Sequence, residues 1–583
     1  MSERNKLSKT PFLKLLAFIR PYIFYVIAGL AFEIVSVSVR LMGPGRLSRI
    51  TDLISEGLSG KMDIVEIVKI CVFLLAAYAL GAVLSYFTSL IMTKVTQRIN
   101  KKLRSDISLK INRLPAGYFH KTSTGDILSR VTNDVDAIGQ TMQQSVVTLV
   151  SSAAMFVGSV TVMFVTQPLL AVCATVPSLI GFIIVGRIVK RSRRYFSERQ
   201  QSLGSINGHV EEMYSGHTVV RLFNAEDTEK KKFNVLNERM YKANKNSQFF
   251  SGLMQPIMNF AGNIGYVSVC IAGAALVLSS KLNFGTIVAF MVYVRLFTAP
   301  LSGFAQGLGQ LQITSAASGR VFEFLETEEI KAESDTKKLS TVKGEVVFER
   351  VRFGYSPDKT VIKNFSEKIN AGQKVAIVGP TGAGKTTLVN LLMRFYEVSD
   401  GRILIDGVPI KEISRKDLRD MFGMVLQDTW LMDASIRENI VYGKEGITDE
   451  RVWGVLKTAG LYRFVKELPK GLDTVINEKL TLSAGQKQLV TIARAMIEDA
   501  PMLILDEATS SVDTRTEAVT VKAMDELSAG KTSFVIAHRL STIKNADKIL
   551  VMKDGDVIET GTHRELIKKG GFYSELYKSQ FDK

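Results

Sequence analysis

Cysteine is scarce in this sequence, which contains three in 583 residues. Cys71, Cys173 and Cys270 lie far apart, each within an apolar run and without histidine or acidic neighbours at metal-ligand spacing. This pattern excludes a disulfide framework and predicts three small, buried apolar side chains. The sequence also lacks a convincing signal-peptide cleavage site, and the apolar run after its basic N-terminus continues far beyond a signal-peptide core. We interpret that run as a first membrane-spanning helix.

The formal net charge of +17 would fit a nucleic-acid-binding protein, so its location along the chain matters. Residues 1–20, 94–136 and 187–245 carry net charges of +4, +5 and +6, and all three segments flank apolar runs. Lys and Arg accumulate in this way on the cytoplasmic side of membrane proteins. We therefore predict contact with membrane lipids and no nucleic-acid partner.

Six apolar runs are long enough to cross a bilayer. The third and fourth are separated only by a tight Thr-Gln-Pro turn. The two longest connections between runs are basic, so the positive-inside rule places them and both termini in the cytoplasm. The six predicted spans lie at roughly 21–44, 70–93, 139–165, 168–186, 247–276 and 284–308.

The long connections, residues 94–136 and 187–245, have a helix-favouring composition, which predicts that the spans continue well into the cytoplasm. Residues 118–126 and 215–223 mix aromatic, glycine and polar side chains and are predicted to form the tips of these extensions. Composition leaves two interpretations of the tips open, a docking surface and a solvated turn.

Three charged residues fall within the predicted spans. Glu33 and Arg40 are seven residues apart on one helix face, so they form either a structural pair or a polar lining of a substrate cavity. Arg295 has several aromatic neighbours, and for this residue a cavity lining is slightly favoured over a structural pair.

Residues 379–386 read Gly-Pro-Thr-Gly-Ala-Gly-Lys-Thr, between a β-favouring run and a helix-favouring run. Strand, glycine-rich loop and helix are the context of a phosphate-binding loop, whose backbone N–H groups surround a polyphosphate. The lysine is predicted to reach the β- and γ-phosphates, and the first threonine to hold Mg²⁺. The predicted nucleotide contacts from this stretch are Gly379, Pro380, Thr381, Gly382, Ala383, Gly384, Lys385, Thr386 and Thr387.

Polar residues with matching chemistry follow other apolar runs. Asp506 and Glu507 end the run at 502–505, where Asp506 suits Mg²⁺ ligation and Glu507 suits polarisation of an attacking water. His538 follows a second run and is predicted to contact the γ-phosphate. Gln427 is predicted to touch Mg²⁺ or the water, and Tyr355 to stack on a base with little power to choose among bases.

At these residues the sequence resembles the ATP-binding cassette (ABC) exporters, and the resemblance covers nearly the whole chain. Residues 482–486, Leu-Ser-Ala-Gly-Gln, look like the family's signature motif, and 510–513 look like its D-loop. The resemblance implies that two such domains face head to tail around two ATP molecules, with the tips acting as coupling helices. It adds Ser483, Gly485, Gln486 and Asp513 to the nucleotide contacts.

One departure from the family pattern concerns Ala484, where the usual signature has glycine, and residues 475–481, which lack the usual Gly-Glu-Arg-Gly reading. A Cβ restricts the backbone where N–H groups should approach a phosphate. The chain thus combines an intact catalytic half with a weakened signature. This combination looks like one member of a heterodimeric exporter pair.

The sequence therefore predicts an α-helical, six-span transmembrane domain of exporter type over residues 1–325, a polar linker over 326–341, and an α/β ATP-binding domain over 342–583. The predicted function is ATP-driven export of amphipathic, drug-like substrates across a bacterial plasma membrane, with ATP and Mg²⁺ as cofactors and a second half-transporter as partner. The alternatives are a homodimeric lipid or peptide exporter and a non-transporting membrane regulator switched by nucleotide.

Overall fold

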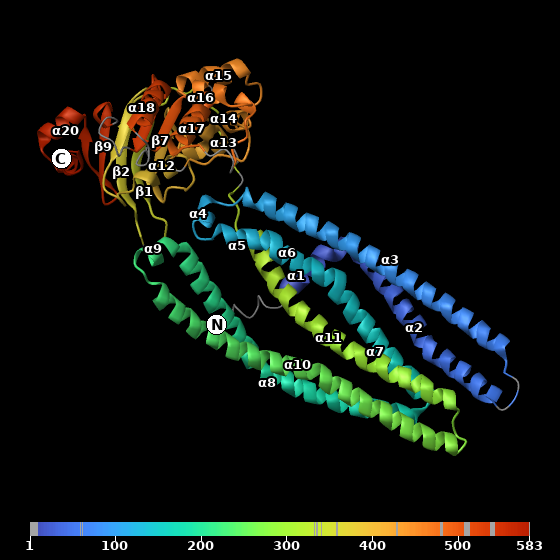
Figure 1. Cartoon of the computed structure of the whole chain (residues 1–583). Helices are drawn as coiled ribbons and strands as arrows, with labels where there is room; N and C mark the ends of the chain where they lie inside the picture. Colours follow the sequence, from blue (N-terminus) through green and yellow to red (C-terminus); the bar gives the residue numbers. More distant parts are fainter. Residues whose placement is uncertain are drawn as a thin grey trace. The chain divides into compact units, whose positions relative to one another are not determined.

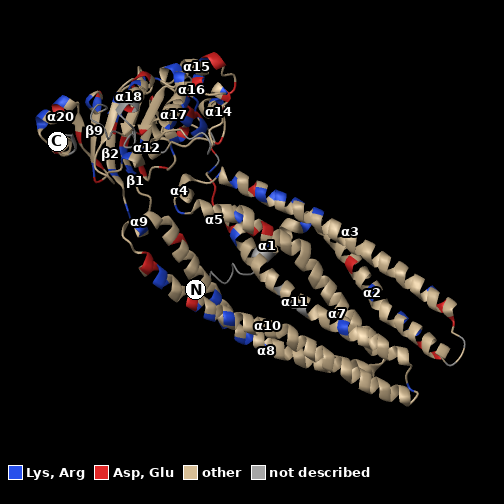
Figure 2. Cartoon of the chain, in the orientation of Figure 1, with Lys and Arg blue, Asp and Glu red and all other residues tan. Residues whose placement is uncertain are grey.

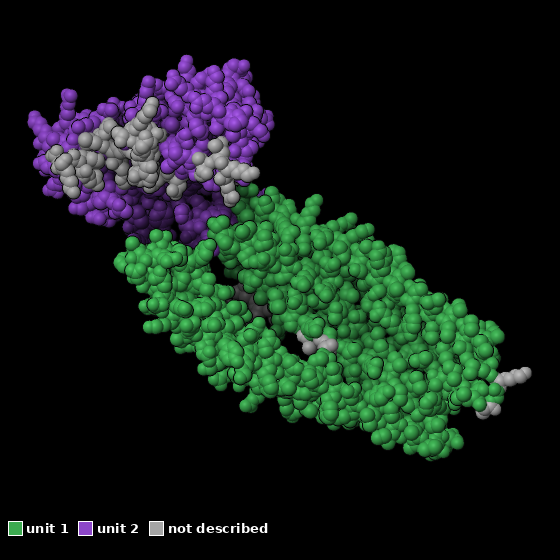
Figure 3. All heavy atoms as spheres, viewed as in Figure 1, with its two compact units in different colours: residues 1–112, 124–327 green, residues 113–123, 328–583 purple. Residues whose placement is uncertain are grey.

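A computed structural model of the chain describes residues 10–58, 60, 62–331, 333, 336–339, 341–356, 359–426, 429–477, 482–506, 514–536 and 543–581. The chain divides into two compact units (Figure 3). The first contains residues 1–112 and 124–327, and the second contains residues 113–123 and 328–583. A short piece of the connection between the second and third spans therefore belongs to the second unit.

Six helices of the first unit are long and apolar enough to cross a membrane, which confirms the six predicted spans (Figure 1). The third of these stretches begins at Thr124, and two short π-helical segments interrupt it before α7. A short helix, α1 (Thr10–Ile19), precedes the first span. The spanning helices are α2 (Ile23–Leu58), α3 (Ile64–Ile111), α7 (Val146–Thr166), α8 (Pro168–Ser215), α10 (Glu226–Leu278) and α11 (Phe284–Leu325).

The longest of these helices extend far beyond a bilayer. At 1.5 Å per residue, the 48 residues of α3 and of α8 and the 53 residues of α10 reach about 70–80 Å, whereas a hydrocarbon core is about 30 Å thick. In Figure 2 the charged residues of α8 and α10 gather toward one end of the helices. The structure agrees with the prediction that the spans continue as helices outside the membrane.

Helices α8 and α10 pack closely because small residues line their contact. A Cβ added to Gly181 would lie 2.5 Å from the Cβ of Ala261, and one added to Gly265 would lie 3.0 Å from the carbonyl oxygen of Ala174. Small residues let helix backbones approach in lipid, where packing rather than water exclusion drives association. These glycines therefore hold the fourth and fifth spans together.

The ends of the first unit differ in how they connect the spans. At one end, α7 and α8 are separated by Gln167 alone, which has an extended backbone (φ −158°, ψ 102°) before Pro168 at the helix start. At the other end the connections contain the short helices α4 (Ala116–Phe119) and α9 (His217–Leu222), within or beside the predicted tips.

The charged residues in the spans have other partners than those considered from the sequence. Glu33 is buried and accepts a hydrogen bond from the Ser85 hydroxyl at 3.0 Å. Arg40 Nη2 lies 3.5 Å from the Ser36 hydroxyl, and the described residues contain no Glu33–Arg40 ion pair. The structural pair is therefore not formed.

The cysteine prediction was wrong for Cys71, which is exposed in the isolated chain, whereas Cys173 and Cys270 are partly buried. An apolar side chain on a membrane-spanning helix can face lipid instead of protein, so an apolar run does not predict burial within the fold.

The second unit contains two sheets. A four-stranded antiparallel sheet has the order β2-β1-β4-β5. A six-stranded sheet has the order β10-β9-β3-β8-β7-β6, in which the strands from β9 to β6 pair in parallel and β10 pairs antiparallel with β9. The strands are β1 (Val346–Phe353), β2 (Ile362–Ile369), β3 (Lys374–Val378), β4 (Asp400–Ile405), β5 (Val408–Pro409), β6 (Phe422–Val425), β7 (Met502–Asp506), β8 (Thr532–Ile536), β9 (Lys548–Lys553) and β10 (Asp556–Gly561).

Helices cover the larger sheet, whose central strands are buried on both faces, as parallel strands usually are. On β7, Met502 and Ile504 join the core shared with the smaller sheet, whereas Leu503 and Leu505 join a separate helical core. The helices are α12 (Lys385–Leu392), α13 (Arg415–Asp420), α14 (Ile436–Val441), α15 (Asp449–Thr458), α16 (Tyr462–Glu467), α17 (Ala484–Glu498), α18 (Thr514–Ser528), α20 (His563–Lys569) and α21 (Phe572–Phe581).

Part of the predicted linker is fixed to the second unit. Glu333 forms ion pairs with Arg394 at 3.1 Å and with Arg415 at 2.8 Å, and Arg394 is buried. Lys337 pairs with Glu412 at 2.7 Å. A polar composition predicted a linker here, but it did not predict these attachments.

We predict that a cysteine at Lys281, in the turn between α10 and α11, reacts with a membrane-impermeant maleimide added outside intact cells. A cysteine at Ser123, beside the basic connection that contains α4, stays unreacted, because Lys and Arg favour the cytoplasmic side. Both variants are measured in a background without the three native cysteines. Labelling at Ser123 alone would contradict this orientation.

Candidate nucleotide site

The glycine-rich loop lies between β3 and α12, as the sequence predicts. Gly382 (φ +86°) and Gly384 (φ +101°) have left-handed backbones that other residues rarely adopt. A Cβ at Gly384 would also lie 2.7 Å from the Ile362 side chain, and one at Gly379 would lie 2.2 Å from the Met552 carbonyl oxygen. Glycine is thus favoured at Gly382 for conformation, at Gly379 for space and at Gly384 for both reasons.

Lys385 is the first residue of α12 and is buried. Its ammonium donates hydrogen bonds to the carbonyl oxygens of Gly379 at 2.8 Å and Pro380 at 3.1 Å. Burial lowers the pKa of Lys385 from its usual value, and the negative charge of Asp506 opposes this shift. An anion beside the ammonium would stabilise its charged form, so the site favours a negatively charged ligand.

A cavity of about 710 Å³ opens over this loop. Its volume lies within the range of about 300–1,000 Å³ that is usual for ligand sites. The Tyr355 hydroxyl lies 3.0 Å from the Thr387 hydroxyl, which fixes the aromatic ring beside the loop. The structure brings together residues predicted separately, since the lining includes Tyr355, Thr381, Gly382, Gly384, Lys385, Thr386, Thr387 and Asp506.

The donor set in this cavity fits Mg²⁺. Thr386 offers a hydroxyl and Asp506, at the end of β7, offers a carboxylate, and hard cations prefer such oxygen ligands. These two residues would hold Mg²⁺, which would offset the negative charge of a bound polyphosphate. Lys359 also lines the cavity and was not predicted, since no motif includes it.

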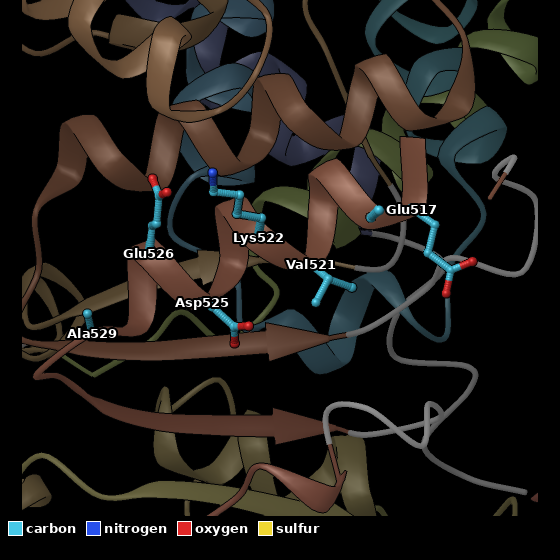
Figure 4. A pocket seen from close by; sticks show the side chains of 7 residues that line it. Glu517, Val521, Lys522, Asp525, Glu526 and Ala529 are labelled. Carbon is cyan, nitrogen blue, oxygen red and sulfur yellow. The ribbon is translucent and has the colours of Figure 1, made fainter. Parts of the chain in front are cut away.

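A second groove, of about 740 Å³, runs along α18 (Figure 4). Glu517, Asp525 and Glu526 line it, and Lys522 is the one basic residue among the described residues of the lining. Asp525 also pairs with Lys374 at 2.8 Å. Three carboxylates disfavour a polyphosphate, so this groove does not compete with the cavity over the loop.

Ser483 precedes α17, and its side chain caps the helix. The Ser483 hydroxyl accepts a hydrogen bond from the Gln486 amide at 3.2 Å, and the Gln486 side chain accepts one from the Ser483 amide at 2.9 Å. This capping box holds the start of the helix rigid. Ala484 is the exposed first residue of α17 with an ordinary helical backbone, so its Cβ causes no backbone strain in this chain.

Residues 26–301 match the family described as ABC transporter transmembrane region, and residues 362–510 match the family described as ABC transporter. The chain is 42% identical over 519 residues to a fatty acid ABC transporter ATP-binding/permease protein of Mycobacterium bovis, which covers 89% of this chain and 82% of the relative. This chain belongs to the ABC transporter family. Its fused domains make it a half-transporter of exporter type that hydrolyses ATP.

Two other relatives carry different names. The chain is 35% identical over 499 residues to an ATP-dependent lipid A-core flippase of Syntrophus aciditrophicus, covering 85% of this chain and 83% of the relative. It is 36% identical over 489 residues to a probable multidrug resistance ABC transporter ATP-binding/permease protein of Bacillus subtilis, covering 83% and 72%. The names of these three relatives thus mention different substrates.

Four predicted site residues of this ABC half-transporter, Gln427, Glu507, Asp513 and His538, lie outside the described residues. The neighbouring parallel strands β6, β7 and β8 end at Val425, Asp506 and Ile536, each shortly before one or more of these residues in the sequence. Carboxyl ends of parallel strands meet at one edge of a sheet, where open α/β sheets bind ligands. Their roles stay predictions.

Tyr396 joins the nucleotide cavity to the short helix α4. Its ring centroid lies 5.1 Å from that of Tyr355 and 6.2 Å from that of His120, and a Cβ at Gly117 would lie 3.2 Å from its ring. Burial raises the pKa of Tyr396, and its hydroxyl has no hydrogen-bond partner among the described residues. No sequence motif identifies this residue, because the contact depends on where the connection after α3 folds.

We predict that Tyr396→Ala lowers ATP affinity severalfold and weakens the stimulation of ATPase activity by substrate. The change removes the ring that supports both Tyr355 and α4, and aromatic pairs contribute about 0.5–1.5 kcal/mol beyond their buried area. Tyr396→Phe is the matched control, since it keeps the ring and removes only the unpaired hydroxyl. Nucleotide titration and substrate-stimulated ATPase assays measure both effects, and equal behaviour of the two variants would contradict the role of the ring.

Proposed function

We propose that this chain exports amphipathic substrates of the multidrug or lipid type across a bacterial plasma membrane, as one half of a two-chain ABC transporter. The observation that carries the proposal is one nucleotide cavity, containing Tyr355, Lys385 and Asp506, in the same chain as six membrane-crossing helices. Both termini are proposed to be cytoplasmic, beside the ATP-binding domain.

Catalysis is proposed to use the residues around this cavity. Lys385 and the loop amides would hold the phosphates, and Thr386, Asp506 and Gln427 would hold Mg²⁺. Glu507 would polarise the attacking water and His538 would contact the γ-phosphate. Ser483, Gly485 and Gln486 would cap the ATP of the partner chain, with Asp513 at the same interface.

The substrate class is proposed from two observations. The names of three relatives mention a fatty acid, lipid A and multidrug resistance, and the two named compounds are amphipathic. The described spans of this chain also combine apolar faces with polar groups such as Arg40 and Arg295, which are exposed in the isolated chain. Intramembrane charges are costly facing lipid and often mark a substrate pathway.

We predict that Glu507→Gln retains ATP binding and loses most hydrolysis, because removal of a general base costs about 10²–10⁴ in rate. The purified complex is assayed for nucleotide binding and ATPase activity. In inverted membrane vesicles the unmutated protein should drive ATP-dependent uptake of an amphipathic dye, with the variant as the matched inactive control. Uptake that persists in the variant would reject ATP-driven export by this chain.

The proposed partner is a related half-transporter with an intact glycine at the position equivalent to Ala484. A heterodimer would give one complete ATP site, formed by this chain's catalytic residues and the partner's signature. A homodimeric exporter is the second candidate, and the unstrained backbone at Ala484 favours it. The heterodimer is expected if the Ala484 methyl group obstructs the phosphate of an ATP bound to the other chain. The homodimer is expected if it does not.

We predict that Ala484→Gly raises the ATPase rate of the chain purified alone, because it removes that methyl group from the signature. Co-expression with a genomically neighbouring half-transporter should raise the rate further. Size-exclusion chromatography with ATPase assays compares the three preparations. Full activity of the unmutated chain alone, unchanged by Ala484→Gly, would establish the homodimer instead.

A further inference from the structure

A cavity of about 880 Å³ lies among four helices of the first unit, α2, α3, α7 and α11. Nothing in the nucleotide chemistry accounts for it. The lining residues are Ser38, Leu41, Met42, Gly45, Arg46 and Arg49 from α2, Glu66 and Ile70 from α3, Gly158, Thr161, Val162 and Thr166 from α7, and Tyr293 from α11.

The cavity changes character along the helices. Arg46, Arg49 and Glu66 lie toward the ends of α2 and α3 that are joined by their short turn. The part of the cavity further from that turn is apolar. It is lined by Leu41, Met42, Ile70 and Val162. A charged end and an apolar end together match an amphiphile, whose headgroup stays near the membrane surface while its chain enters the hydrocarbon region.

The charges at the polar end do not cancel. Arg49 Nε lies 3.2 Å from Glu66 Oε1, so this pair is neutral. Arg46 packs its guanidinium 5.1 Å from the ring centroid of Phe73, and the described residues provide it with no carboxylate partner. The cavity therefore carries one unmatched positive charge, held in place by an aromatic ring.

We propose that this cavity binds the carboxylate headgroup of a single acyl chain, a long-chain fatty acid, with Arg46 as the residue that selects the charge. A planar guanidinium pairs with a carboxylate through two hydrogen bonds. One negative charge balances Arg46, whereas lipid A carries several, and a phospholipid needs room for a second chain. The fatty acid named for the relative at 42% identity has the same chemistry.

Contacts between the lining helices hold the walls of the cavity in place. The Tyr293 hydroxyl donates to the Leu41 carbonyl oxygen at 3.3 Å, which ties α11 to α2 beside the cavity. At Gly158 an added Cβ would lie 2.3 Å from the Leu41 side chain, so glycine lets Leu41 of α2 pack directly against α7 at the wall of the cavity. The cavity volume lies within the usual range for ligand sites.

This proposal rests on the proposed export of amphiphiles, but binding can be measured without transport. The full-length transporter, with its partner chain if it has one, is placed in nanodiscs of zwitterionic lipid. It is labelled with a photoreactive diazirine analogue of palmitic acid. Palmitate, hexadecanol and phosphatidylglycerol are the competitors, and peptides from α2 and α7 are examined for the label.

We expect palmitate to compete at least tenfold better than hexadecanol, because only the acid forms charge-assisted hydrogen bonds with a guanidinium. Arg46→Gln should weaken palmitate about tenfold and leave hexadecanol unchanged. Arg46→Lys, which keeps the charge, should retain part of the preference. Lys281→Gln removes an exposed charge outside the lining and should change nothing.

Equal competition by palmitate and hexadecanol, or an unchanged preference in Arg46→Gln, would overturn the site. Phosphatidylglycerol competing as well as palmitate would show a general anionic-lipid site and also overturn it. Arg46-dependent binding without ATP-driven uptake of palmitate in vesicles would reject export of the fatty acid but leave the site. The two proposals therefore fail in different ways.

Discussion

The pairing of β3 with β8 on one side and β9 on the other is the constraint on which the nucleotide site depends. Both pairings are parallel and bury β3, so the loop that follows Val378 must leave the sheet at its carboxyl edge. Asp506 reaches the same edge because β7 is parallel to β8. The left-handed backbones of two glycines then turn the chain directly into α12, whose first residues line the cavity over the loop.

The membrane-spanning helices meet a different constraint, since every backbone polar group in lipid must be paired within its own helix. Long helices satisfy this condition, and α3, α8 and α10 are longer than a hydrocarbon core is thick. Residues 113–123, between α3 and α5 (Thr124–Ser129), belong to the second unit although the helices on either side of them belong to the first. Tyr396 contacts both His120 of this piece and Tyr355, so the packing of the piece is linked to that of the ring beside the glycine-rich loop.

Much of this arrangement follows from patterns that are local in sequence. Uninterrupted apolar runs predict membrane spans because the thickness of the bilayer fixes the length of a span. The phosphate-binding loop at 379–386 is recognisable because its glycines, lysine and threonine each have a separate chemical role. Contacts between distant segments are not local. Glu33 pairs with Ser85 rather than with Arg40, and Arg46 packs on Phe73, because the rotation of α2 against α3 decides which faces meet. Periodicity on one helix cannot give that rotation.

Ala484 shows where a sequence argument depends on geometry. The expectation of a weakened signature was based on the restriction that a Cβ places on the backbone, but helix α17 begins at this residue with an ordinary helical conformation and a capping box around it. Any effect of the methyl group must then arise at the surface it presents to another chain, where it would exclude a phosphate or a water. Such an effect would change the ATP site formed by two chains and leave the stability of the single chain unchanged. The surface of the partner chain, and not the fold of this chain, therefore determines whether alanine is tolerated at this position.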